Sequence, residues 1–111
     1  MITLRFRAVN KDIFEAIISG KKKIETRAAT KKYRNVKAGD TIILVCGSKR
    51  INKKVSKVEL FKSMATVLKK YKPENINPKT HTTKEVRDMW YSFPGYKEKI
   101  KKYGLIVFHL G

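Results

Sequence analysis

The sequence predicts a mixed α+β fold in which about five strands form a small, partly closed β-barrel with short helices inserted between them. Three observations lead to this prediction. The chain opens and closes on strand-like segments, short amphipathic helices separate the other strands, and 111 residues suit a single domain spanning 1–111. Terminal strands with inserted helices favour an α+β architecture over repeated βαβ units.

The composition is sufficient for a hydrophobic core. Hydrophobic residues make up 41% of the chain and aromatic residues 10%, although 32% of the residues are charged. No apolar run approaches the roughly eighteen residues of a membrane span, and the N-terminus lacks the apolar centre of a signal peptide. We therefore expect a cytoplasmic protein that does not enter a membrane.

The first half of the chain is predicted to hold a strand, a helix and two further strands. Apolar and polar residues alternate in the first strand, from Ile2 to Phe6. Asn10 can cap a helix that carries an apolar stripe and ends at Gly20. Strands are then expected at 23–27 and 41–46, with a basic loop at 28–38 between them.

The second half begins with a polar turn at 47–54, followed by a strand at 55–61 with a solvated lysine face. Ser63 and Thr83 are candidate caps of two helices, separated by a loop at 71–82. The segment 93–95 interrupts the second helix, and a brief helix at 96–102 follows. The last strand, 105–110, is continuously apolar, which predicts burial on both of its faces.

Cysteine and histidine are too few for a zinc site built by the protein alone. The chain has one cysteine, Cys46, and two histidines that lie far apart in the sequence, His81 and His109. Cys46 ends an apolar run, which favours a buried structural thiol. We expect no metal and no cofactor.

The charge balance points to an anionic partner. Lysine and arginine number 27 against 9 acidic residues, which gives a net charge of +18. Such a surface attracts polyanions, so RNA or another single-stranded nucleic acid is the expected partner, with a nucleotide-like small molecule as the alternative. A lysine-rich, solvated surface without a specific partner explains the same charge, and charge alone does not separate these possibilities.

The densest group of polar residues spans 20–27, directly after the first helix. Glu25 and Arg27 lie two positions apart in a predicted strand, so their side chains share one face, and Lys23 shares it if the strand begins there. Lys22 lies in the turn and need not follow this alternation. A carboxylate beside a guanidinium can orient it for a phosphate or a base edge. A solvated strand edge fits the same residues, because helix C-termini attract lysines.

The same segment resembles the ASCH domain family. It matches the pattern Gly-x-Lys-x-x-Glu-x-Arg through Gly20, Lys22, Glu25 and Arg27. The resemblance extends to a Gly-Asp pair before an apolar strand, an aromatic-Pro segment at 91–96 and a Tyr-Gly pair before the last strand. It implies a PUA-like barrel with a cleft lined by Lys22, Glu25 and Arg27, next to Lys21 and Lys23, and it implies binding of RNA or another nucleic acid.

Some bacterial relatives in that family are small amidohydrolases that deacetylate acetylcytidine, which leaves an enzyme as the alternative function. Lys22 and Glu25 are the candidate catalytic residues in that case. The chain departs from the hydrolase pattern, because Glu25 stands where those enzymes have a threonine. The candidates for their distal catalytic carboxylate are Glu74 and Glu85. A structural accessory domain is a third possibility.

Aromatic side chains near the C-terminal helices are candidates for stacking on an unpaired base. Tyr91 and Tyr96 are expected at the surface, where they can contact a ligand. Trp90 and Phe93 are expected in the core. We also expect His109, inside an apolar strand, to be a structural histidine.

Overall fold

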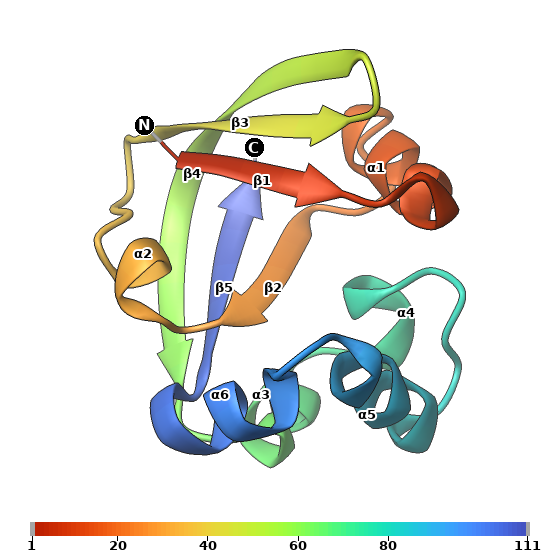
Figure 1. Cartoon of the computed structure of the whole chain (residues 1–111), viewed down its shortest axis with the longest axis vertical. Helices are drawn as coiled ribbons and strands as arrows, with labels where there is room; N and C mark the ends of the chain where they lie inside the picture. The colour runs from red at the N-terminus through yellow and green to blue at the C-terminus, as the bar shows by residue number, and fades with distance from the viewer. Residues whose placement is uncertain (1, 111) are drawn as a thin grey trace.

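A computed structural model describes residues 2–110, which form a curled sheet with short helices around it (Figure 1). The strands are β1 (Ile2–Phe6), β2 (Ile24–Ala28), β3 (Thr41–Cys46), β4 (Lys49–Phe61) and β5 (Leu105–Leu110). The helices are the 3₁₀ turn η1 (Ala8–Asn10) and α1 (Lys11–Ile18), α2 (Lys31–Arg34), α3 (Met64–Lys70), α4 (Pro73–Ile76), α5 (Thr83–Ser92) and α6 (Tyr96–Tyr103).

The five strands follow the order β1-β3-β4-β5-β2, which leaves β1 and β2 at the two edges of the sheet. β1 runs parallel to β3, and the other neighbours are antiparallel. The long strand β4 pairs with β3 through its first half and with β5 through its second half, with a register shift between Val55 and Lys57. This irregularity lets one strand serve both halves of a curled sheet. The mixed α+β half-barrel predicted from the sequence is confirmed.

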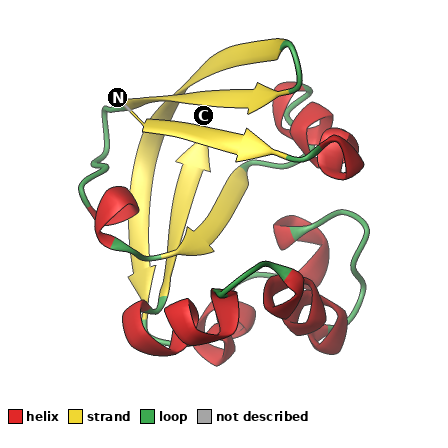
Figure 2. Cartoon of the chain, in the orientation of Figure 1, coloured by secondary structure: helices red, strands yellow, loops and turns green. Residues whose placement is uncertain are grey.

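Two hydrophobic clusters lie on opposite faces of β5. Ile106 and Phe108 contribute to the cluster inside the half-barrel. Leu105 and Val107 join the cluster formed with helices α3 to α6, which gather at one end of the sheet (Figure 2). The expected burial of the last strand on both faces is therefore confirmed, since a central strand covered by helices has no solvated face.

The predicted polar turn over 47–54 is wrong. The turn comprises only Gly47 and Ser48, and β4 begins at Lys49. The register pairs residues 49–54 with 46–41 of β3, and Ile51 packs against the barrel core. The strand was missed because Ile51 is the one apolar residue in 49–54, so no alternation of apolar and polar residues marks it.

The helix boundaries differ from the prediction in small ways. The expected loops contain two one-turn helices, α2 and α4. Ser63 caps α3 as predicted, whereas the cap of α5 is Thr82 rather than Thr83. Asn10 precedes α1 without a capping hydrogen bond from its side chain. Among the described residues, no helix is long and apolar enough to cross a membrane.

Candidate ligand-binding cavity

The site is built on β2, an edge strand that follows the turn after α1. The Lys22 N–H donates to the Ala16 carbonyl oxygen, at 3.0 Å, which ties the turn back to the helix. Ile24 packs into the cluster under the helices, as its place in the alternation predicts. Glu25 pairs with Phe108 across the sheet, so its side chain lies on the face toward the barrel.

Lys22 and Glu25 form a buried ion pair. The Lys22 side chain is 1% exposed, and its Nζ lies 3.0 Å from Glu25 Oε1. The same ammonium donates to the carbonyl oxygen of Ile24, and Glu25 Oε1 also accepts from the N–H of Thr26 at 3.0 Å. Since β2 is an edge strand, the ion pair supplies partners for two backbone groups that lack a neighbouring strand.

Arg27 completes this network on the side of the cavity. Its Nη2 lies 3.3 Å from Glu25 Oε2, and its guanidinium lies 5.1 Å from the centre of the Phe6 ring. Phe6 ends β1, so this contact spans the two edges of the open barrel. The guanidinium is thereby held between a carboxylate and an aromatic face, which fixes the direction of its remaining N–H groups.

The charges around Glu25 keep its carboxyl group ionised. Burial raises the pKa of Glu25, but the neighbouring Lys22 and Arg27 more than offset this, so the pKa lies below its ordinary value. Burial lowers the pKa of Lys22, and the attraction of Glu25 opposes that change. Each charge of the pair therefore depends on the other to remain in the interior.

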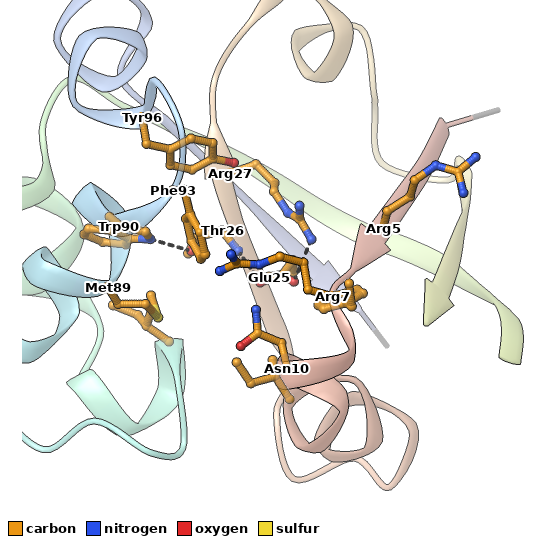
Figure 3. A pocket seen from close by; sticks show the side chains of 13 residues that line it. Arg5, Arg7, Asn10, Glu25, Thr26, Arg27, Met89, Trp90, Phe93 and Tyr96 are labelled. Carbon is orange, nitrogen blue, oxygen red and sulfur yellow. Dashed lines mark hydrogen bonds and ion pairs between the residues drawn. The ribbon is translucent and has the colours of Figure 1, made fainter. Parts of the chain in front are cut away.

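A cavity of about 210 Å³ lies between this network and the helices (Figure 3). One wall consists of β2 and the end of β1 with the turn after it, and the other wall consists of α4, α5 and the start of α6. The side chains that line it are Arg5, Phe6, Arg7, Asn10, Ile13, Glu25, Thr26, Arg27, Ile76, Met89, Trp90, Phe93 and Tyr96. The cavity thus combines an apolar, aromatic wall with charged groups from the strands.

The rings of the aromatic wall are held in place by a hydrogen bond, by contact with one another and by a neighbouring guanidinium. The Trp90 ring is buried, and its Nε1–H donates to the Thr26 hydroxyl oxygen at 3.2 Å. Phe93 and Tyr96 meet edge to face, with 5.1 Å between their ring centres. The Arg7 guanidinium lies 5.3 Å from the centre of the Phe93 ring. An aromatic face beside a guanidinium suits a planar ligand that carries negative charge.

The structure brings only some of the candidate site residues together. Glu25, Arg27 and Tyr96 line the cavity. Lys22 lies behind Glu25 and is not among the lining side chains, and Lys21 and Lys23 are exposed outside it. Tyr91, which is 39% exposed, does not line the cavity and lies instead near the ammonium of Lys97. The roles of these residues in ligand binding stay predictions.

Sequence reasoning missed the contribution of β1 and of the turn after it. Arg5, Arg7 and Asn10 line the cavity together with Arg27. Phe93, expected in the core, is half-buried and also lines it. One signal was present, because the lysine-rich chain has only six arginines and three of them lie at this cavity. Arginine is the basic residue suited to planar, directed recognition of anions and bases.

Within residues 2–110, Glu25 is the one carboxylate that lines the cavity. Glu85 lies in the capping box at the start of α5, where its side chain accepts from the backbone of Thr82. Glu74 is exposed in α4. The described residues contain no group of three metal-ligating side chains that could hold an ion.

Fold and site together define a PUA-like half-barrel with a cavity beside its open edge. The ASCH domain model matches residues 8–110, and the chain belongs to that family. The structure is similar to the crystal structure of hypothetical protein PH0355, with a TM-score of 0.76, 26% identity, and coverage of 98% of this chain and 97% of that one. It is also similar to the solution NMR structure of protein PF0455 from Pyrococcus furiosus, with a TM-score of 0.74, 25% identity, and coverage of 98% and 96%. No curated protein matches the chain.

Proposed function

We propose that this protein binds single-stranded RNA by taking one unstacked base into the cavity beside β2. The observation that carries the proposal is the combination of an aromatic wall with arginines in one cavity of about 210 Å³. Proteins that bind single strands commonly stack bases on aromatic side chains and hold the backbone with cations. Membership in the ASCH domain family, for which binding of RNA is the expected function, agrees with this proposal.

The size of the cavity favours a single ring system as the group inside it. Clefts for drug-sized ligands typically measure roughly 300–1,000 Å³, and this cavity is smaller. Phe93 offers a half-buried ring at the wall, and Tyr96 supports it edge to face. The sugar and phosphates of a bound nucleotide would then remain outside, near the arginines.

The arginines and the overall charge favour a polymer over a free nucleoside. Arg7 is exposed at the cavity, and within residues 2–110 it forms no ion pair with a carboxylate. It is therefore available to a phosphate. A nucleoside without phosphates gains nothing from a net charge of +18, whereas an RNA strand releases counterions on binding such a surface.

We expect binding of single-stranded RNA to weaken steeply as salt rises. If about four phosphates are contacted, the logarithm of affinity should fall with the logarithm of salt concentration with a slope near −3. Fluorescence anisotropy titrations with a labelled oligonucleotide at several salt concentrations measure this slope. Absence of binding at low salt, or affinity that does not change with salt, would contradict the proposal.

Variants of the cavity separate a specific site from diffuse attraction. Replacing Arg7 with glutamine should weaken binding by about 1.5–3 kcal/mol, the usual worth of a hydrogen bond to a charged group. The matched control is Arg87→Gln, which removes the same charge from an exposed position on α5. Equal losses in the two variants would leave only a general electrostatic surface and would refute the cavity as the site.

The amidohydrolase alternative has one feature in its favour, a cavity of a size suited to a base with the Glu25 carboxylate in its wall. We expect weak or absent deacetylation of acetylcytidine. The Lys22 ammonium, a candidate base, already donates to Glu25 and Ile24 and lies outside the lining of the cavity. Amide hydrolysis also requires a base and donors for the oxyanion, so Glu25 alone would have to activate water.

Release of acetate from acetylcytidine by the purified protein tests this expectation. Turnover well above the uncatalysed rate, abolished in Lys22→Met or Glu25→Gln protein that remains folded, would establish the enzyme and overturn our preference for a binding module.

A further inference from the structure

The outer face of the half-barrel carries a row of residues that begins at the cavity. The register pairs Arg5 of β1 with Val45 of β3, and Val45 with Arg50 of β4. The preceding row in β1 pairs Leu4 with Leu44, and both side chains lie in the barrel core. Because side chains alternate along a strand, Arg5 and Arg50 point to the opposite, outer face. We call Arg5, Val45 and Arg50 the arginine row.

The charge of this face is uncompensated. β1, β3 and residues 49–54 of β4 contain no acidic residue. Both arginines of the row are exposed, and within residues 2–110 neither forms an ion pair with a carboxylate. Asn52 and Lys54 follow Arg50 at alternating positions and are exposed as well. The face therefore offers free N–H donors to an anion.

Arg34 shows what an arginine with a structural role looks like in this fold. Its guanidinium donates to the carbonyl oxygens of Ala29, at 2.7 Å, and Tyr103, at 2.6 Å, and so joins the segment after β2 to the end of α6. Neither Arg5 nor Arg50 makes a side-chain hydrogen bond of this kind among the described residues. The arginines of the row thus hold no part of the fold together.

The row is continuous with the cavity. Arg5 belongs to the lining of the cavity, yet its guanidinium points away from the other labelled side chains and out over the sheet (Figure 3). Arg50 lies two strands further on, which corresponds to roughly 10 Å between the backbones. Long, flexible side chains at this spacing can contact neighbouring phosphates of one strand.

We propose that the arginine row binds the phosphates of nucleotides that flank the base held in the cavity, so that a bound strand leaves the cavity across β1, β3 and β4. This inference rests on the proposed function, because it extends the same RNA beyond the cavity. Guanidinium groups hold phosphates through paired hydrogen bonds. Such contacts position the strand without reading its sequence. Val45, which lies between the arginines, is partly exposed and uncharged.

Replacement of Arg50 by glutamine tests the row with an oligonucleotide and a mononucleotide side by side. For a single-stranded RNA of roughly eight nucleotides, within the range that small barrels bind, affinity should fall and the salt slope should become less steep. Loss of one phosphate contact should change the salt slope by about 0.7 and should lower the affinity for the oligonucleotide roughly fivefold at 0.1 M salt. Affinity for adenosine monophosphate, which reaches only the cavity, should stay unchanged.

Arg87→Gln is the control for the loss of one exposed guanidinium. If Arg50→Gln and Arg87→Gln weaken oligonucleotide binding equally, the arginine row is refuted while the cavity can still hold a base. If Arg50→Gln weakens oligonucleotide binding and Arg7→Gln does not, the row binds phosphates but the cavity fails as the site, which overturns the path from cavity to row. In an Arg5→Gln, Arg50→Gln double variant, the change in salt slope relative to the unmodified protein should be about twice the change in Arg50→Gln alone. A change no greater than in the single variant would also refute the row.

Discussion

Replacing Glu25 with glutamine is expected to destabilise the fold by about 3–5 kcal/mol, the usual cost of removing one partner from a buried ion pair. The Lys22 ammonium would then remain in the interior, with its side chain 1% exposed and only carbonyl groups as acceptors. An exposed pair of the same residues would contribute about 0–1 kcal/mol. Chemical denaturation of the two proteins measures the difference.

A second substitution identifies the cause of that loss. Lys22→Met added to Glu25→Gln should recover most of the lost stability, because it removes the ammonium that no longer has a partner. If the double variant is less stable than Glu25→Gln alone, an uncompensated buried charge is not the reason for the loss.

The pH dependence of the Glu25→Gln variant follows from the same charge. Burial lowers the pKa of Lys22 in the folded protein, and loss of the carboxylate lowers it further. Between this pKa and the ordinary value of 10.5, the unfolded chain binds more protons than the folded one. Stability of the variant should therefore rise as pH increases from the lowered pKa of Lys22 toward 10.5. A decline over this range would contradict the assignment.

The overall fold was accessible from the sequence because its main signals are local. The alternation in β1, the apolar stripe of α1 and the continuous apolar run of β5 each follow from the period of one element. The first half of β4 was missed for the opposite reason. Its pairing with β3 depends on a hairpin turn of only two residues. Ile51 is surrounded by cations, so its inward position gave no alternating pattern that predicts a strand.

The candidate site was accessible only in part. Glu25 and Arg27 follow from the alternation of β2, and both line the cavity. The burial of Lys22 was not predictable, because a residue in a turn has no periodic orientation and the covering groups come from distant segments. Arg7 was missed because it follows the last residue of β1, where the chain leaves the sheet and the alternation no longer applies.

The substitution with the largest expected effect on stability outside the ion pair is Gly104→Ala. Gly104 joins α6 to β5 with φ at +77° and ψ at −158°, a conformation that side chains other than glycine rarely adopt. A Cβ atom there would lie 2.2 Å from the carbonyl oxygen of Phe61 in β4. The backbone conformation alone costs about 1–3 kcal/mol, and the clash requires the backbone of β4 to move as well. We therefore expect a loss of more than about 3 kcal/mol.

Gly95→Ala is the matched control for this substitution. Gly95 has a similar φ of +73°, but a Cβ atom there would meet only the end of the Lys99 side chain, at 3.7 Å. It should cost about 1–2 kcal/mol, the price of a left-handed residue without a clash. Urea denaturation of both variants compares them directly. Because the Gly104 carbonyl oxygen also accepts from the N–H of Ala29 at 2.9 Å, movement at Gly104 should loosen the end of β2. Equal losses of stability in the two variants would show that the β4 backbone moves away from the added methyl group without lowering the stability of the fold.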